Sequence, residues 1–377
     1  MDSQEPTFQS ALHVMPGIEG GHDGLPAQKP HEVPPGEERQ PGFRRRTMTT
    51  REYVEGIESG DRTRLAKAIT LIESNSSAHF AKAQELLKYI LPRAGGAIRI
   101  GITGVPGAGK STFIESFGSY LTNSGKKVAV MAVDPSSSVT GGSILGDKTR
   151  MEKLATDPNA FIRPSPSGGT LGGVARKTRE ALLVFESAGY DVVLVETVGV
   201  GQSETTVRSM VDFFLLVLVP GAGDELQGIK KGVVELADAI LINKADGANL
   251  IPAQSARAEY ERALHYLQPA TEGWQTIAMT ASALTGEGIP EVWQTIQGFV
   301  ESTKQSGAFR KRRRAQEREW MRALIEGHLK EQFYENPEIQ KLLPKLDEAV
   351  MAGEIPATMA AQQLLEAFRA RAMQVDT

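Results

Sequence analysis

Short apolar runs alternate with helical stretches over the middle of the chain, and this alternation predicts its main architecture. The runs are rich in Val, Ile, Leu and Phe, and they cover residues 98–102, 128–133, 192–195, 213–219, 239–242 and 276–279. Continuous β-prone runs separated by helices are typical of a parallel sheet covered by helices on both faces. We therefore predict an α/β fold with a mostly parallel central sheet.

Helical periodicity marks both flanks of this alternating region. Leu65, Ile69 and Ile72 recur at spacings of four and three, and a second helix closes before Pro92. After residue 307 no strand pattern remains. Three helices are expected there, over residues 309–334, 338–351 and 358–373.

The beginning of the chain follows a different pattern. It is rich in Pro, Gly and Glu and lacks apolar periodicity, which predicts a disordered segment because little apolar surface can be buried. The expected organisation is a disordered tail (1–48), a helical segment (49–96), a P-loop NTPase domain (97–306) and a C-terminal helical arm (307–377).

Composition and charge argue against several classes of protein, including nucleic-acid-binding and membrane-spanning ones. A net charge of −4 provides no basic field, so nucleic acid is not an expected partner. The absence of cysteine excludes disulfides and thiolate metal sites. The longest notable apolar run, residues 213–219, is far shorter than the roughly 18 residues of a membrane span. The start of the chain resembles neither a signal peptide nor a transit peptide. A cytoplasmic protein without membrane contact is expected.

The sequence after the first apolar run matches the phosphate-binding pattern GxxxxGK[ST]. It lies between a predicted strand and a predicted helix, as that pattern requires. Glycines let backbone amides turn towards an anion, and the helix start adds its dipole. Lys110 is expected to reach the β and γ phosphates, and Ser111 to offer its hydroxyl to Mg²⁺. A glycine-rich turn without ligand is the alternative. The predicted phosphate-binding residues are Gly104, Val105, Pro106, Gly107, Ala108, Gly109, Lys110, Ser111 and Thr112.

An acidic residue follows the apolar run at 192–195. Glu196 stands at the strand end where P-loop enzymes hold Mg²⁺, usually through water. Gly199 would let the backbone approach the γ phosphate. The common GTPase pattern here is DxxG, and the longer Glu196 indicates a changed water bridge rather than loss of the metal. A solvated carboxylate at a strand end is the alternative.

Residues 243–246 (NKAD) form an NKxD pattern directly after a predicted strand, about 130 residues beyond the phosphate loop. Guanine presents an N1–H and an exocyclic amine side by side, and Asp246 can accept from both. Lys244 can stack its stem on the ring, and Asn243 can tie this loop to the phosphate loop. The triplet Ser282, Ala283 and Leu284, after the next strand, resembles the loop that contacts the guanine carbonyl. GTP and GDP are the predicted ligands, with a solvated loop as the alternative.

Three further segments allow more than one interpretation. Asp134 follows a predicted strand and so lies at the edge where phosphates bind, but an Asx turn before Pro135 explains it equally well. Residues 147–150, taken alone, are as compatible with a charged helix face as with a role in the site. The basic run 310–314 opens a helix, and a solvated face is favoured over an acidic partner or a second subunit.

Longer motifs occur in a characteristic order and carry a resemblance. They are residues 133–137 (VDPSS), 141–150 (GGSILGDKTR), 161–166 (FIRPSP), 169–173 (GTLGG), 196–204 (ETVGVGQSE) and 223–231 (GDELQGIKK). Together they closely resemble the MeaB/ArgK/MMAA family, a branch of the metallochaperone-type P-loop GTPases. The likeness covers roughly residues 50–375.

The resemblance implies a function and an assembly. It implies a G-protein chaperone of adenosylcobalamin-dependent acyl-CoA mutases, chiefly methylmalonyl-CoA mutase, which gates cofactor delivery and protects or reactivates the mutase. Cobalamin itself is not expected to bind directly. The family also implies a homodimer joined through C-terminal helices. A P-loop phosphotransferase and a metallochaperone delivering nickel or zinc are the alternative functions.

The resemblance further assigns roles to residues. Asp134 and Asp147 would lie near Mg²⁺ in a first switch region, together with Ser111 and Glu196. Residues 196–204 would form a second switch. Residues 221–231 would form an extra switch loop that signals to the mutase through Gln227 and Lys230. The predicted catalytic residues are Lys110, Asp134, Asp147, Glu196 and Gly199.

Overall fold

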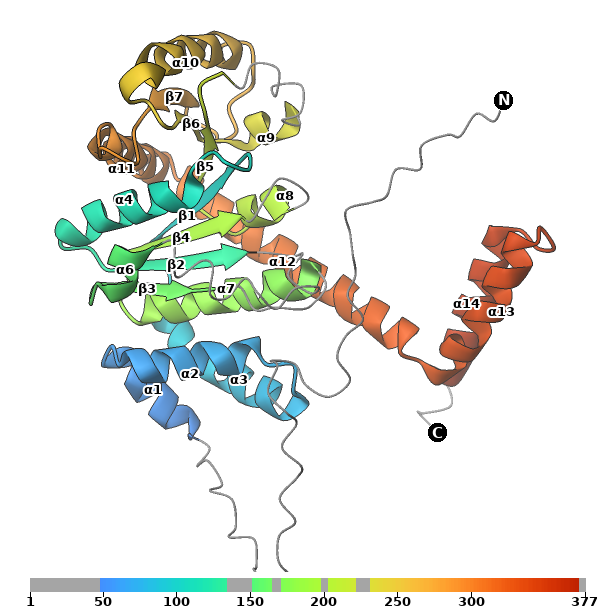
Figure 1. Ribbon diagram of the computed structural model, residues 1–377. Helices are drawn as coiled ribbons and strands as arrows, with labels where there is room; N and C mark the ends of the chain where they lie inside the picture. The colour runs from blue at the N-terminus through green and yellow to red at the C-terminus, as the bar shows by residue number, and fades with distance from the viewer. Residues whose placement is uncertain (1–47, 134–150, 165–170, 198–202, 222–230, 373–377) are drawn as a thin grey trace, which may run out of the picture. The chain divides into compact units, whose positions relative to one another are not determined.

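A seven-stranded sheet forms the centre of the protein, in the order β3-β2-β4-β1-β5-β6-β7 (Figure 1). The computed structural model describes residues 48–133, 151–164, 171–197, 203–221 and 231–372. All neighbouring strands pair in parallel. The predicted α/β class is confirmed. The strands are β1 (Ile98–Gly104), β2 (Val128–Val133), β3 (Ala160–Arg163), β4 (Val192–Thr197), β5 (Phe213–Leu218), β6 (Ala239–Ile242) and β7 (Ile277–Thr280).

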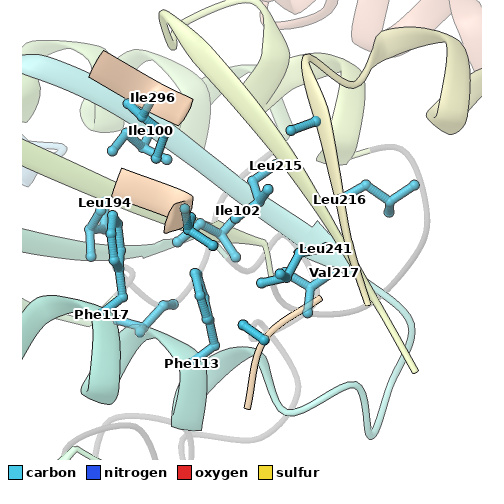
Figure 2. Packing of buried hydrophobic residues seen from close by; sticks show 14 of the residues in the cluster. Ile100, Ile102, Phe113, Phe117, Leu194, Leu215, Leu216, Val217, Leu241 and Ile296 are labelled. Carbon is cyan, nitrogen blue, oxygen red and sulfur yellow. The ribbon is translucent and has the colours of Figure 1, made fainter. Parts of the chain in front are cut away.

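Side chains alternate between two helical layers because successive residues of a strand point to opposite faces. Val192 and Leu194 join one buried cluster, whereas Val193 and Val195 join the other. Figure 2 shows Phe113 and Phe117 of one helix beside Leu194 and strand residues of the first cluster. Helices of the first layer are α4 (Lys110–Asn123), α10 (Leu250–Leu264) and α11 (Ile289–Gln305).

The second layer contains the helical lead-in expected before the sheet. Its buried residues include Ile69 and Leu86, which pack in one cluster with Phe185 and Val195. The helices of this layer are α1 (Thr50–Glu58), α2 (Arg62–Glu73), α3 (Ser77–Ile90) and α7 (Leu171–Ser187). Short elements connect the strands: η1 (Leu91–Arg93), α6 (Glu152–Thr156), α8 (Ser203–Arg208), α9 (Lys231–Leu236) and η3 (Gly247–Asn249).

The region around residue 163 differs from the sequence-based prediction. The two prolines and four glycines of residues 163–173 predict a loop. Instead, Arg163 ends the edge strand β3, which pairs with β2, and α7 begins at Leu171. The edge strand was missed because its four residues end in a charged side chain and lead directly into prolines, so it lacks the continuous apolar run by which β6, of equal length, was recognised. Residues 165–170 lie outside the described ranges.

Three helices follow the sheet, close to the positions expected from periodicity. They are α12 (Ala308–Tyr334), α13 (Pro337–Met351) and α14 (Ala357–Ala372). Ile339, Leu346 and Leu364 form a small buried cluster of α13 and α14, against which Phe333 of α12 packs. None of the helices in the described ranges is long and apolar enough to span a membrane.

The basic run at the start of α12 is not a uniformly solvated face, which corrects the favoured interpretation. Arg310, Lys311 and Arg314 are exposed as expected. Arg312 and Arg313 instead have side chains only 15% and 14% exposed, and both pair with carboxylates of the same chain. The helical pattern could not show this because the partners lie more than 70 residues away in the sequence.

Strand β1 lies at the point where the strand order reverses. Its two neighbours are β4 and β5, and the chain reaches β4 only after adding β2 and β3 on that side. In open parallel sheets such a switch point creates a crevice at the carboxyl ends of the strands, where ligands bind. A ligand is therefore expected to bind at the residues that follow β1 and β4.

Candidate nucleotide-binding site

The phosphate loop connects β1 to α4 and is fitted closely to the neighbouring strand. Gly104 has φ +152°, and an added Cβ would lie 2.0 Å from the carbonyl oxygen of Val217 in β5. Gly109 is left-handed at φ 80° and forms the N-cap of α4. An added Cβ at Gly107 would meet nothing within 4 Å. The loop thus leaves open space over its middle, where GxxxxGK[ST] loops cradle phosphate.

Lys110 begins α4 and lies among backbone carbonyls and carboxylates. Its ammonium donates to the carbonyl oxygens of Gly104, at 2.8 Å, and Val105, at 3.2 Å. Burial lowers the pKa of Lys110, while the negative charges of Glu196 and Glu204 act in the opposite direction. The lysine is therefore a partly desolvated cation, which interacts more strongly with an anion than an exposed lysine does.

The structure brings Ser111 and Glu196 together from separate elements. Ser111 lies in the first turn of α4, and its hydroxyl donates to Oε1 of Glu196 over 3.0 Å. Glu196 is 5% exposed near the end of β4. The next residue, Thr197, donates a hydroxyl hydrogen bond of 2.8 Å to Thr103 of β1, which fixes the two strand ends side by side. A hydroxyl and a carboxylate at this position form the hard oxygen set that suits Mg²⁺.

Asn243 connects the loop after β6 to the phosphate loop. Its side chain is 1% exposed and donates a 2.9 Å hydrogen bond to the carbonyl oxygen of Ala108. Its amide oxygen accepts from the backbone N–H of Ala283 at 3.2 Å. An added Cβ at Gly109 would lie 2.8 Å from Nδ2 of Asn243, so glycine is needed for this close approach. One buried amide therefore holds three loops in register.

Lys244 and Asp246 follow Asn243 in the loop after β6. Asp246 accepts a hydrogen bond from the hydroxyl of Ser282. That hydroxyl also accepts from the N–H of Thr285 at 3.1 Å, so the orientation of Ser282 is fixed. Lys244 adopts φ 60°, and its side chain is exposed. Leu284, at 82% exposure, lies in the same loop as Ser282. The residues expected to recognise guanine thus converge on one end of the sheet.

Comparison with known proteins agrees with this arrangement. A family model described as methylmalonyl Co-A mutase-associated GTPase MeaB matches residues 65–338. A putative GTPase of Caulobacter vibrioides is 56% identical over 312 residues, covering 83% of this chain and 95% of the relative. The methylmalonic aciduria type A homolog of Mus musculus, described as mitochondrial, is 47% identical over 326 residues, covering 84% and 79%. A crystal structure described as an LAO/AO transport system kinase superposes with a TM-score of 0.70 at 40% identity, covering 85% of this chain and 97% of the other.

The chain belongs to the MeaB family. Membership of the MeaB family confirms the resemblance found in the motifs, and it confirms the predicted enzyme class, a P-loop GTPase. Several residues that the MeaB resemblance singles out lie outside the described ranges. They are Asp134, Asp147, Gly199, Gln227 and Lys230.

Glu204 of this MeaB-family protein ends the expected second switch, residues 196–204, but no individual role could be assigned to it from the sequence. It lies in the first turn of α8 and is 2% exposed. Its negative charge acts on Lys110 in the same direction as that of Glu196. The only sequence signal was its position at the end of the motif 196–204, because burial beside a lysine on another element depends on the folded chain.

Proposed function

We propose that this protein is a Mg²⁺-dependent GTPase that acts as a G-protein chaperone of an adenosylcobalamin-dependent acyl-CoA mutase. Methylmalonyl-CoA mutase is the first candidate partner, because the matching family is described as associated with that enzyme. The observation that carries the proposal is the contact between Ser111 and Glu196 beside Lys110. It brings together the residues expected to bind phosphate, to hold the metal ion and to begin the second switch. A cytoplasmic location is part of the proposal.

The protein's own residues would perform the binding steps. Lys110 would exchange its loop carbonyl partners for the β and γ phosphates, and the desolvated ammonium would stabilise the charge that develops during transfer. Ser111 and Glu196 would hold the metal ion, Glu196 through water. Bound Mg²⁺ would neutralise charge on the β and γ oxygens. Asp134 and Asp147 are proposed to complete this region.

Base selection would depend on Asp246. Its carboxylate can accept from both donors of guanine, whereas the Watson–Crick edge of adenine does not offer this donor pair. Ser282 already orients the carboxylate, so little ordering is required upon binding. Asn243 keeps this loop at a fixed distance from the phosphate loop, which sets the length of the ligand that fits.

A homodimer is proposed on the basis of an apolar stripe on α12. Met321, Ile325 and Leu329 recur every four residues and are 55%, 52% and 55% exposed, and Leu324 lies beside them at 38%. Residues at this spacing share one helix face. Apolar side chains exposed in a continuous stripe mark an interaction surface, and a second copy of the same helix would cover it.

The experiment is a steady-state GTPase assay with and without methylmalonyl-CoA mutase. The residue after Gly199 is Val200, which cannot hydrogen-bond an attacking water, so a basal rate on the order of 10⁻⁴ to 10⁻² s⁻¹ is expected, as in unassisted GTPases. The mutase should accelerate hydrolysis. Gln227→Ala and Lys230→Ala should lose this acceleration but keep GTP binding and the basal rate.

Lys67→Ala serves as the control, because Lys67 is exposed on α2. It should respond to the mutase like the wild type. A fast basal rate that the mutase leaves unchanged would contradict the chaperone proposal while leaving GTP hydrolysis intact. Absence of GTP hydrolysis under all conditions would contradict the enzyme assignment itself.

A further inference from the structure

A cluster of arginines and carboxylates lies where α12 meets the sheet. Its acidic members are Glu186, Asp212 and Asp238, all at most 4% exposed. Burying an ionised carboxylate without a partner is strongly unfavourable, so each needs a cation nearby. The basic members are Arg99, Arg208, Arg312 and Arg313. We call these residues the arginine–carboxylate cluster.

One half of the cluster fastens α12 to the start of β1. Arg313 makes a bidentate pair with Asp212, with Nε and a terminal nitrogen 2.7 and 2.6 Å from its two oxygens. The same guanidinium donates to the carbonyl oxygens of Gly95, at 2.9 Å, and Ala97, at 2.7 Å. These partners of Arg313 lie outside the phosphate loop. We therefore interpret this half of the cluster as a structural anchor.

The other half is centred on Asp238, which directly precedes β6. Its carboxylate accepts from the backbone N–H of Phe214 at 2.9 Å and from the hydroxyl of Thr271. Arg208 of α8 approaches it to 3.5 Å, and Arg312 of α12 approaches both oxygens to 3.4 Å. Burial raises the pKa of Asp238 to about 6, while the charge of the neighbouring Arg208 guanidinium favours the ionised form. One carboxylate therefore bridges guanidinium groups from two helices.

Arg208 also contacts the end of a third helix. Its Nε donates a 2.8 Å hydrogen bond to the carbonyl oxygen of Leu236, the last residue of α9. The turn after α8 is held by α12 as well, since the side-chain amide of Gln316 donates to the carbonyl oxygens of Val211, at 2.9 Å, and Arg208, at 3.3 Å. The C-terminal end of α8 is therefore fixed to α12 by side chains at two positions one turn apart.

The N-terminal end of the same helix lies at the phosphate site. Glu204 and Arg208 are four residues apart in α8, one turn of helix. Glu204 is buried and acts on Lys110, whereas Arg208 is buried in the arginine–carboxylate cluster. The two side chains therefore stand one helical turn apart, with Glu204 near Lys110 and Arg208 in the arginine–carboxylate cluster.

We propose that the bridge Arg208–Asp238–Arg312 couples the nucleotide bound at the phosphate loop to the position of α12. A carboxylate beside Lys110 and the terminal phosphate of GTP compete for the same ammonium, so GTP favours a displaced α8 more than GDP does. The bridge opposes that displacement by tying α8 to α12. Coupling between two sites is reciprocal, so a change in α12 also changes the preference for GTP over GDP. This inference rests on the proposed GTPase function.

The test compares affinities for GTPγS and GDP in the full-length protein. Arg312→Gln removes one arm of the bridge and should tighten GTPγS binding relative to GDP by roughly 5-fold, at the lower end of typical coupling between sites. Arg312→Lys keeps the charge but cannot contact the carbonyl oxygen of Asp212 and the carboxylate of Asp238 through two separate nitrogens, and it should give a smaller shift in the same direction. Lys311→Gln is the matched control, since the neighbouring Lys311 pairs with Glu272 on the surface, with both side chains at least 75% exposed.

A second measurement separates coupling from general destabilisation. Hydrogen exchange over residues 308–320 should differ between the GTPγS and GDP complexes of the wild type, and this difference should shrink in Arg312→Gln. In a Glu204→Gln background the carboxylate that competes with the terminal phosphate for Lys110 is absent, so Arg312→Gln should no longer shift the nucleotide preference.

Three outcomes would overturn the coupling. They are an unchanged affinity ratio in both Arg312 variants, an equal shift in Lys311→Gln, and a shift that persists in full in the Glu204→Gln background. A wild type that binds neither nucleotide would instead contradict the proposed function. If Arg312→Gln fails to fold, as judged by thermal unfolding without nucleotide, Arg312→Lys and the exchange measurement on the wild type decide the question.

Discussion

Asp246 illustrates how a single side chain can be prepared for its ligand. The hydroxyl of Ser282 holds the carboxylate, and the backbone of Thr285 holds Ser282. The carboxylate is therefore held in place by the loop that contains Ser282 and Thr285. Preorganisation of this kind favours selectivity, because a wrong base leaves a fixed, partly buried acceptor without its donors.

Replacing this carboxylate by an amide should change the base that the protein selects. We expect Asp246→Asn to weaken GTP binding by roughly 100-fold or more, because the amide offers a donor where guanine also donates. Xanthosine triphosphate should bind better than GTP to this variant, since xanthine has a carbonyl in place of the exocyclic amine. Competition between the two nucleotides in a filter or fluorescence assay measures the effect.

Glu259→Gln provides the control for that substitution. Glu259 is an exposed carboxylate on α10, and its loss should leave the GTP affinity unchanged. An Asp246→Asn protein that keeps full preference for GTP would show that another group recognises the base.

Sequence patterns located some of these residues and could not locate others. Ser111, Glu196 and Asp246 follow strands at motif positions, and the carboxyl ends of parallel strands meet at one edge, so their proximity could be expected. Glu204 and Arg312 carry no comparable pattern. Glu204 ends a motif and Arg312 lies in a basic run, but neither pattern shows that the side chain is largely removed from solvent. That low exposure depends on partners brought together by folding.

At the scale of the element, two glycines of the phosphate loop have different reasons to be glycine. Gly104 lies where a Cβ would overlap the backbone of β5, whereas Gly107 has φ +79° and open space around it. Backbone atoms of a central strand cannot move aside cheaply, but a left-handed alanine costs only about 1 kcal/mol. Gly104 is therefore required for the close packing of β1 on β5, whereas Gly107 keeps open the space in which the ligand is expected.

Alanine substitutions should separate these two roles. Gly104→Ala should lower the free energy of unfolding by about 2–4 kcal/mol, because β1 must shift away from β5. Gly107→Ala should lower it by only about 1 kcal/mol but should weaken GTP binding, since its methyl group enters the space over the loop. Urea unfolding without nucleotide and a nucleotide-binding assay measure the two effects. Equal destabilisation by both substitutions would contradict this division.

The elements also show where sequence reasoning succeeds and fails. Strands such as β2 and β6 were predicted at their observed bounds, because a continuous buried run has a strong signal. The edge strand β3 and the start of α7 were missed, because prolines and glycines dominate that part of the sequence. Pairing with β2 and packing of α7 on the lead-in helices outweigh the local preference there.

At the scale of the whole molecule, the exposed stripe on α12 predicts the oligomeric state. Ile325→Asp places a charge in the middle of that stripe and should weaken the homodimer at least roughly 30-fold, as removal of a central interface residue does. The basal GTPase rate should change little, because the phosphate site lies on other elements. Sedimentation or light scattering over a concentration series measures the association.

Lys330→Asp is the matched control for the dimer. Lys330 is exposed on the opposite side of α12, at about 180° from Met321 when each residue advances the helix by 100°. It should leave association unchanged. A monomeric wild type, or equal weakening by both substitutions, would show that the stripe does not join two copies.

The anchor formed by Arg313 has a consequence for the order in which the chain folds during synthesis. Arg313 and the carbonyl oxygen of Ala97 that it binds are separated by 216 residues. At typical elongation rates of about 5–20 residues per second, the ribosome needs roughly 10–40 s to cover that distance. Until then the carboxylates of Asp212 and Asp238 lack the guanidinium groups that α12 supplies. The contact between α12 and the backbone before β1 is therefore expected to form last, and a chain released before residue 308 should leave that backbone and these carboxylates accessible to chaperones and proteases.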